Sequence, residues 1–565
     1  MPSNFEEEFI KYNPIIFDLK HIKKSNILKS NNDIIFSNNI AYPEFNLGFN
    51  YFIHQAKDKM DQTEKFATRK KIYLVTSLFE KNIDYKEETD NGVKFTSIDN
   101  GIKSFIKQIN PKFPQILNRA FLKLWEILVM FDLIPDENTF VSSHLAEGPG
   151  SFIQATILYR EMQAKLGLIK SFNKDKYYGV TLHSDHEHLL MQKEFIKYFE
   201  DEKFGRLNIL ETKSIQEIKD MYGGSRKYKD VATNGDLTRI STINIFGGAK
   251  GEKGYAEPSD LITADGGFDW KKENLQEQEA YRLIFGEIVS ALKLQKNGGN
   301  FVIKIFESFT KVTVKMIELL RVFYKKVYLV KPYTSRISNS EKYVVCKDFD
   351  KSVLTASVLK NLEEMIISMN KNELFNILDI FTDYEISEDT MKDYKDINLQ
   401  LLLKQYTGIN NIIRFINLDN YNDIDFNTFL DKQIEASHFW NNTFLDVKLF
   451  TKINKFCSSY DYFKFINDND AKNIVTIPII TPKSDEKTES EEEVKSTKTT
   501  KNNKSGVKRQ TKKRVQKGGN IPENNIIEQK INYESDKSIN SEDEIIGYLS
   551  DKDNLDTIDL SNINI

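Results

Sequence analysis

Short apolar runs alternate with helical patterns through the middle of the chain. Seven runs of five to seven residues, rich in β-branched and aromatic side chains, predict strands at 139–145, 177–182, 206–210, 260–265, 300–306, 326–331 and 342–347. Between them, apolar residues recur at three- and four-residue spacing, most clearly over 272–296. Strands that alternate with helices indicate a parallel, doubly wound sheet with helices on both faces. We therefore expect an α/β fold.

One more helix is predicted just before the first of these strands, from 114 to 134. Its apolar side is marked by Leu117, Phe121, Leu124, Trp125 and Leu128. Arg119, Lys123 and Glu126 fall on a single polar stripe of the same helix. Taken alone, such a stripe indicates a solvated face that carries ion pairs.

The pattern divides the chain into four parts. The segment 1–95 mixes short apolar and polar runs, which predicts a mixed α/β extension. Residues 96–350 contain the alternating strands and helices, whereas 351–475 show helical patterns only and predict an all-α appendage. The segment 476–565 has the composition of a disordered polyampholyte tail.

Acidic and basic residues form separate blocks along that tail. Six acidic residues between Asp485 and Glu493 precede ten Lys or Arg residues between Lys495 and Lys517. The basic block has three interpretations, which the sequence leaves open. It binds RNA or DNA through phosphate contacts, it is a nuclear address, or it only solvates the tail.

Overall composition narrows the class of protein. The 79 basic and 83 acidic residues give a net charge of -4, so no global field indicates a nucleic-acid partner. Two cysteines are too few for a disulfide framework or a cysteine zinc site. No run of about 18 apolar residues predicts a membrane span. We expect a soluble, intracellular protein with no membrane partner.

The segment Leu145-Ala-Glu-Gly-Pro-Gly-Ser-Phe152 joins a predicted strand to a predicted helix. A glycine turn in this position brings backbone N–H groups close to a ligand. By itself it fits a dinucleotide, a nucleoside cofactor, or a close packing turn with no ligand.

Three ionisable residues stand in or beside apolar strands, namely Asp265, Lys304 and Glu341. Ligands of doubly wound sheets bind beyond the carboxyl ends of the strands, where the strand order reverses. We therefore expect the glycine turn and Asp265 to share one rim. His183, His186 and His188 also follow a predicted strand, but a solvated loop is expected there and no metal site.

Lys123, Asp265, Lys304 and Glu341 occur in the order of the Lys-Asp-Lys-Glu tetrad of ribose 2′-O-methyltransferases. Over about residues 115–348 the sequence resembles the FtsJ-type family, and within it the cap-specific mRNA (nucleoside-2′-O)-methyltransferases of eukaryotes and large DNA viruses. The resemblance implies a Rossmann-like fold that uses S-adenosylmethionine, with the four residues of the tetrad in catalysis.

The resemblance also implies which residues hold the cofactor. They lie in the glycine turn, in Asn234-Gly-Asp-Leu-Thr238 and after the fourth strand, and comprise Glu147, Gly148, Pro149, Gly150, Ser151, Phe152, Asp236 and Asp265. Two positions depart from the family pattern. His144 stands where many members have an acid, and Ser151 stands where the commonest turn has glycine.

Lys304 is the expected proton acceptor for the ribose hydroxyl. Burial in the strand and a second cation at Lys123 lower the pKa of its amine, whereas Asp265 and Glu341 act in the opposite direction. The expected reaction is methylation of the first transcribed nucleotides of capped mRNA. Alternatives are an RNA-binding scaffold subunit of a capping or polyadenylation assembly, and methylation of ribosomal or transfer RNA.

The resemblance makes RNA the expected partner, together with other capping or transcription proteins. The expected location is cytoplasmic, including a viral factory or virion for a viral protein. The basic tail leaves the nucleus open as a second location.

Overall fold

The structure is a computed structural model. It describes residues 4–21, 25–60, 77–81, 83–85, 95–183, 193–202, 204–222, 233–249, 252–267, 273–418, 424–462 and 464. The predicted tail, 476–565, lies outside these residues, as do His186 and His188.

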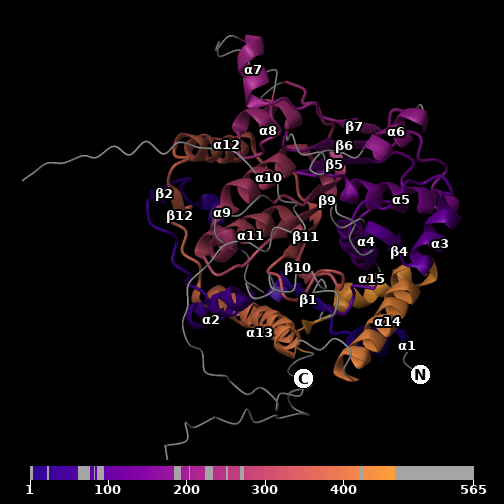
Figure 1. Cartoon of the computed structure of the whole chain (residues 1–565). Helices are drawn as coiled ribbons and strands as arrows, with labels where there is room; N and C mark the ends of the chain where they lie inside the picture. The colour runs from indigo at the N-terminus through magenta and orange to yellow at the C-terminus, as the bar shows by residue number, and fades with distance from the viewer. Residues whose placement is uncertain are drawn as a thin grey trace, which may run out of the picture. The chain divides into compact units, whose positions relative to one another are not determined.

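The centre of the fold is an eight-stranded sheet in the order β1-β10-β11-β9-β8-β5-β6-β7 (Figure 1). Its strands are β1 (Ile15–Asp18), β5 (Val141–Leu145), β6 (Lys176–Val180), β7 (Leu207–Ile209), β8 (Ser259–Ala264), β9 (Gln295–Ile305), β10 (Tyr324–Lys331) and β11 (Lys342–Phe349). Seven of these were predicted within a few residues of their observed bounds. Two small sheets flank it, formed by β2 (Ile34–Ser37) with β12 (Asn376–Ile380), and by β3 (Ile83–Tyr85) with β4 (Phe95–Ile98).

The described helices are α1 (Asn4–Lys11), α2 (Leu47–Asp58), α3 (Asn100–Ile109), α4 (Ala120–Phe131), α5 (Ser151–Lys165), α6 (Lys193–Glu202), α7 (Ile215–Tyr222), α8 (Ile240–Gly247), α9 (Gln276–Glu279), α10 (Tyr281–Leu294), α11 (Lys311–Phe323), α12 (Ala356–Lys371), α13 (Glu388–Leu418), α14 (Ile424–Phe444) and α15 (Phe450–Ser459). No helix in this part of the chain has both the length and the apolar character that a membrane crossing requires.

The prediction of an entirely parallel sheet is wrong at one edge. Strands β5 to β9 pair in parallel, but β11 lies antiparallel between β9 and β10. Ten residues, 332–341, join β10 to β11 without a helix. A parallel pair needs a crossover of a dozen or more residues, so this connection can only build antiparallel neighbours.

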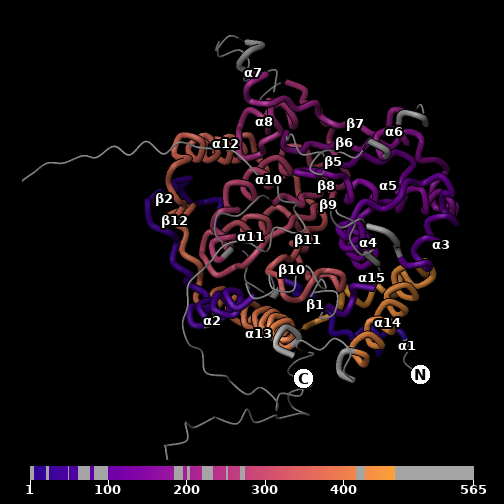
Figure 2. Tube along the Cα trace, viewed as in Figure 1, coloured from indigo at the N-terminus to yellow at the C-terminus, as the bar shows by residue number. Residues whose placement is uncertain are grey.

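The outer edge of the sheet comes from the N-terminal segment, where no strand was predicted. Ile15 to Asp18 pair antiparallel with Lys331 to Tyr328. The indigo N-terminal trace and β10 lie side by side in Figure 2 as well. Four residues are too short a run to separate a strand from a helix by periodicity, which is why the sequence did not indicate β1.

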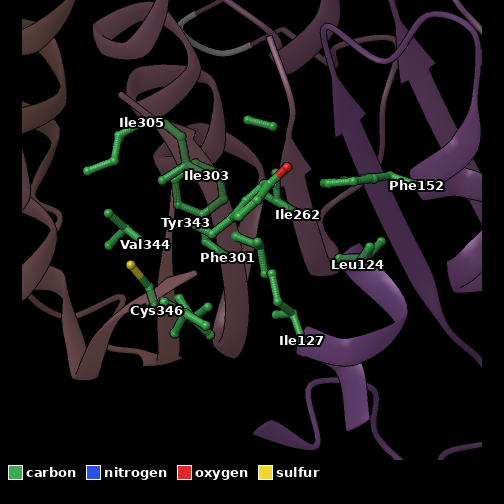
Figure 3. Close-up of a cluster of buried hydrophobic side chains, with 14 of the residues drawn as sticks. Leu124, Ile127, Phe152, Ile262, Phe301, Ile303, Ile305, Tyr343, Val344 and Cys346 are labelled. Carbon is green, nitrogen blue, oxygen red and sulfur yellow. The ribbon is translucent and has the colours of Figure 1, made fainter. Parts of the chain in front are cut away.

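Helices cover both faces of the sheet, as predicted. The crossover from β5 through α5 to β6 runs toward the β7 edge of the sheet. The crossovers from β8 through α10 to β9, and from β9 through α11 to β10, run toward the β1 edge. Because such crossovers are right-handed, α5 lies on the face opposite α10 and α11. The side chains between these layers form one core, part of which is shown in Figure 3.

The region after residue 351 is mainly helical, with one exception. β12 pairs antiparallel with β2 of the N-terminal segment, so the expectation of helices alone is wrong there. Ile377 and Ile380 of this strand are buried. Their three-residue spacing imitates a helix, because a register shift between Ile377 and Asp379 interrupts the two-residue period of the strand.

Candidate active site

The strand order reverses between β5 and β8, and two predicted site segments meet there. The backbone N–H of Asp265, just after β8, donates to the carbonyl of Leu145 at the end of β5, with N···O 3.4 Å. Gly148, the first glycine of the turn, stands three residues after Leu145. The structure therefore places the glycine turn and Asp265 on one rim, where ligands of doubly wound sheets bind.

All four tetrad residues meet at this rim. Lys123 on α4 binds both carboxylate oxygens of Glu341, at 2.8 and 2.9 Å. Lys304 on β9 binds the Asp265 carboxylate at 3.2 Å and donates to its carbonyl at 2.9 Å. Tyr343 connects the two pairs, since its hydroxyl lies 3.0 Å from Asp265 Oδ1 and 3.3 Å from Glu341 Oε1.

The charges of the site stabilise one another. Burial opposes the charged form of Lys304, but Asp265 and Glu341 outweigh it and raise the pKa of the amine above its usual range. Burial likewise opposes ionisation of Glu341, but Lys123, Lys304 and Lys331 outweigh it and lower the pKa of that carboxyl to about 2. At neutral pH, Lys304 is therefore an ammonium ion and Glu341 a carboxylate.

Strand register sets the positions of Lys304 and Tyr343. The two residues are direct partners between β9 and β11. Glu341 stands directly before β11, and its carboxylate lies beside the Tyr343 hydroxyl, so it reaches the face of Lys304 as well. Figure 3 shows Tyr343 beside Phe152 and the core residues of β9.

The polar stripe of α4 is not solvated, so that expectation is wrong. Glu126 is fully buried and accepts hydrogen bonds from the backbone N–H groups of Tyr333 and Thr334, at 2.6 and 2.9 Å. Trp440 of α14 donates to the same carboxyl at 2.9 Å. Burial raises the pKa of Glu126 to about 7 in spite of these donors.

Arg119 completes this arrangement. Its guanidinium donates to the carbonyl of Thr334 at 2.5 Å and pairs with Glu80 at 3.0 Å, and Glu80 also pairs with Arg336 at 2.9 Å. The stripe of α4 thus contacts the 332–341 connection, which ends at Glu341. Periodicity shows that a face is polar, but not that another segment covers it.

The glycine turn has the backbone geometry expected for it. Gly150 has φ 112°, a left-handed conformation that favours glycine, and α5 begins at the next residue. Glu147 accepts a hydrogen bond from the Phe152 backbone N–H at 2.7 Å, which satisfies one donor at the start of the helix. Its second oxygen, Oε2, is buried without a partner. Burial and then Asp265 raise the pKa of Glu147 well above its usual range.

Two residues of the predicted cofactor set are held inside the protein. Ser151 is buried and its hydroxyl donates to Asn118 at 2.9 Å. Phe152 is buried and packs against Tyr343. Their side chains therefore fix the turn in place; Gly148 and Pro149 are its more exposed part, whereas Gly150 is buried.

The segment Asn234–Thr238 lies at the end of β6. A side chain at Gly235, which has φ 82°, would collide with the carbonyl of Thr181. Val180, the preceding residue, accepts a hydrogen bond from the Glu147 backbone N–H at 3.2 Å. The glycine turn and Asn234–Thr238, the two segments that were expected to hold the cofactor, therefore lie next to consecutive carbonyls at the end of β6. Asp236 itself accepts hydrogen bonds from Thr238 at 2.9 and 2.7 Å.

His144, the first departure from the family pattern, is a core residue. Its ring nitrogens lie 2.8 Å from the hydroxyls of Ser142 and Thr263. Burial lowers the pKa of the imidazole to about 3, so the ring is neutral. His183 lies 3.2 Å from the Thr212 carbonyl, and the described residues contain no cluster suited to a metal ion.

Two residues of the site were missed by sequence reasoning. Tyr343 carried a signal, because it stands two residues after Glu341, at the start of the predicted strand 342–347. Glu287 carried a weaker sequence signal, because it is an acidic residue on the buried and otherwise apolar side of a helix. It is buried next to Gly266, and burial followed by Asp265 raises its pKa to about 8 against the opposing effect of Lys304.

With the geometry established, comparison with known proteins identifies the domain. Residues 116–349 match the FtsJ-like methyltransferase family. The resemblance predicted over 115–348 is thereby confirmed. A cap-specific mRNA (nucleoside-2′-O-)-methyltransferase 2 of Drosophila melanogaster is 26% identical over 339 residues, which cover 56% of this chain and 43% of that protein.

Other relatives match over shorter stretches. A cap-specific mRNA (nucleoside-2′-O-)-methyltransferase 1 of Mus musculus is 37% identical over 139 residues, or 23% of this chain and 17% of that protein. The chain thus matches less than half the length of these two relatives. Human methyltransferase-like protein 13 in complex with SAH aligns over 51% of this chain and 95% of its own, with 12% identity and a TM-score of 0.18. The fold assignment therefore rests on the strand order.

Proposed function

We propose that this protein methylates the ribose 2′-hydroxyl of RNA with S-adenosylmethionine, acting on the first transcribed nucleotides of capped mRNA. One observation carries the proposal. Lys123, Asp265, Lys304 and Glu341 come from four separate elements, yet they form one connected cluster at the rim of the sheet. The match to FtsJ-like methyltransferases and the cap-specific names of the relatives support it.

The residues at the rim fit the cofactor. The left-handed Gly150 directly precedes α5, so the turn places the first backbone N–H groups of that helix at the rim. The partnerless Oε2 of Glu147 is a buried acceptor that a ligand donor can satisfy. Glu147, the turn 148–150 and Asp236 would hold the cofactor. When bound, S-adenosylmethionine supplies a methyl group on a sulfonium, which needs only an aligned oxygen nucleophile.

The chain's own residues then orient the hydroxyl and take its proton. Asp265 and Glu341 fix the amine of Lys304 through the contacts described above. Lys304 is an ammonium ion in this state, so it must lose its proton before it can accept one. A positive charge placed beside it lowers its pKa, as does desolvation when a substrate covers the rim. We propose Lys304 as the proton acceptor and Lys123 as a fixed charge that orients Glu341.

The test is methyl transfer by Lys304 variants. Single-turnover rates would be measured with labelled cofactor on matched capped and uncapped RNAs. Lys304→Ala should lower the rate at least ~10²-fold, the lower end of typical general-base contributions. Lys304→Arg should be equally slow, because arginine keeps the charge but cannot be deprotonated near neutral pH.

Each outcome has a distinct meaning. Near-wild-type transfer by Lys304→Arg would rule out proton acceptance and leave only an orienting role. Equal rates on capped and uncapped RNA would remove the cap from the proposal but keep the chemistry. No transfer by the wild-type chain, with RNA still bound, would favour the scaffold alternative. A eukaryotic or large-DNA-virus origin and a cytoplasmic site of action stay predictions.

A further inference from the structure

The connection between β10 and β11, residues 332–341, is held by segments that are distant in sequence. Tyr333 lies among phenylalanine rings whose centroids are 5.2 to 6.0 Å from its own. This aromatic cage consists of Phe9 of α1, Phe79, and Phe439 and Phe444 of α14. The Tyr333 hydroxyl also donates to the Phe9 carbonyl at 2.9 Å. The N-terminal segment and the region after residue 351 therefore enclose the same side chain of the connection.

Glu126 of α4 holds the connection at the same place through hydrogen bonds. Its Oε2 accepts from the Tyr333 backbone N–H at 2.6 Å, and its Oε1 accepts from the backbone N–H and the hydroxyl of Thr334 at 2.9 and 2.6 Å. The indole N–H of Trp440 on α14 donates to Oε1 as well, at 2.9 Å. An apolar residue would pack here without the cost of burying a carboxyl. The hydrogen bonds to the connection and to α14 therefore account for an acid at this position.

α4 contacts the connection at both ends. Glu126 holds its start, and Lys123, nearly one turn earlier on the helix, pairs with Glu341 at its end, at 2.8 Å. The connection can therefore place the Glu341 carboxylate only as accurately as its start is held. A misplacement of about 1 Å is enough to slow a reaction that depends on alignment. Both α1 and α14 lie outside the matched residues 116–349, so this support comes from outside the FtsJ-like region.

We propose that α1 and α14 are positioning elements of the active site, which act through Tyr333 and Glu126 to fix the carboxylate of Glu341. The effect on catalysis rests on the proposed function, whereas the ordering of the connection does not. Phe9, Glu126, Tyr333 and Trp440 act through Glu341 and are not themselves catalytic residues. The proposal gives a role to both extensions of the FtsJ-like region.

Trp440→Phe tests the part of α14, because it removes the indole N–H that Glu126 accepts and keeps an aromatic ring. Trp125→Phe is the matched control. Trp125 of α4 is also fully buried, and its indole N–H donates to the Phe444 carbonyl of α14 at 2.8 Å. The same substitution thus removes a hydrogen bond between the same two helices without changing the donors to Glu126. Phe9→Leu tests the part of α1, because it removes one ring of the aromatic cage and stays apolar.

Hydrogen exchange of the backbone N–H groups measures the order of the connection and needs no turnover. Trp440→Phe should speed exchange over 332–341 about tenfold, because the carboxyl that accepts from the Tyr333 and Thr334 N–H groups has lost one of its own partners. Phe9→Leu should also speed exchange there. Trp125→Phe should lower stability in urea and leave exchange over 332–341 unchanged.

Single-turnover methyl transfer measures the effect on catalysis. Trp440→Phe should slow it about tenfold, whereas S-adenosylmethionine affinity in calorimetry should keep its wild-type value, because the glycine turn lies after β5 and not on the connection. In a Glu341→Ala background Trp440→Phe should cause no further loss, because the group that it positions is absent. Trp125→Phe should retain the wild-type rate.

Unchanged exchange over 332–341 in Trp440→Phe would overturn the role of α14, and the same result in Phe9→Leu would overturn that of α1. Faster exchange with a wild-type rate would overturn the effect on catalysis. Equal rate losses in Trp440→Phe and Trp125→Phe, or a further loss in the Glu341→Ala background, would overturn it in favour of general destabilisation. If the wild-type chain transferred no methyl group to any RNA, the proposed function would fail instead, and exchange would still decide whether α1 and α14 fix the connection.

Discussion

Replacing Tyr343 by phenylalanine isolates the link between the two ion pairs of the tetrad. The substitution removes only a hydroxyl, so the ring keeps its place against Phe152 and opens no large cavity. The lost group lies 3.0 Å from Asp265 Oδ1 and 3.3 Å from Glu341 Oε1. Its single proton is shared between two acidic acceptors.

The contacts set the size of the effect. A hydrogen bond to a charged group contributes about 1.5–3 kcal/mol. Asp265 keeps Lys304 and Glu341 keeps Lys123 after the change, so neither carboxylate is left unpaired. We therefore expect a loss of about 1.5–2 kcal/mol in the free energy of unfolding, from the lower end of that range. If the bridge orients Lys304 to the same extent, methyl transfer slows about 10- to 30-fold.

Single-turnover methyl transfer and urea unfolding of Tyr343→Phe would measure both quantities. Tyr324→Phe is the control. Its hydroxyl also makes one buried hydrogen bond, to Gln295 at 3.0 Å, but at the other end of the sheet. The control should lose about 0.5–1.5 kcal/mol of stability and retain full activity.

A loss of activity beyond about 10²-fold in Tyr343→Phe would refute this reasoning and give the hydroxyl a part in proton transfer. Unchanged activity with reduced stability would show that the bridge is structural only. The phenol is not expected to act as a base, because burial followed by Asp265 and Glu341 raises its pKa well above the usual range.

Further changes test other parts of the argument. Gly150→Val should abolish S-adenosylmethionine binding in calorimetry while the melting curve stays cooperative; unchanged affinity would move the cofactor elsewhere. Gly235→Ala should weaken that binding and cost at least ~1 kcal/mol of stability, because a side chain there meets the Thr181 carbonyl. Unfolding free energy should decrease between about pH 4.5 and 8, as the unfolded chain releases the proton that Glu287 retains when folded; Glu287→Gln should flatten this slope. Deleting 483–565 should weaken binding to long RNA and reduce its salt dependence, while transfer to short RNA persists; an unchanged salt slope would exclude the basic block as a contact.

The sheet was predictable where each strand is a buried apolar run with a helix behind it. A mostly apolar run such as Phe301–Ile305 directly predicts a strand of this kind, because both faces of the strand are covered. The order and direction of the strands at the edge depend instead on connections. The ten residues between β10 and β11 decide that β11 is antiparallel, and only the pairing of β1 with β10 shows that the N-terminal segment completes the sheet.

The residues of the site were predictable for a different reason. Chemistry restricts them to a few side-chain types, so Lys304 and Asp265 stand out against apolar neighbours and the family pattern places them in order. Their partners did not stand out. Glu126 and Arg119 looked like an exposed stripe because the segment that covers them, 332–336, is distant in sequence and has no periodicity of its own.

The charge balance of the site follows from the structure alone. Lys123, Asp265, Lys304 and Glu341 sum to zero when all are ionised. If Glu147 and Glu287 were ionised as well, two more negative charges in the same low-dielectric region would hold the proton on Lys304 more firmly. Burial raises the pKa of Glu147 well above its usual range and that of Glu287 to about 8, so burial works against this additional negative charge. The carboxylates of Asp265 and Glu341 are each paired with a lysine, whereas burial disfavours the charged forms of the two further acids, Glu147 and Glu287.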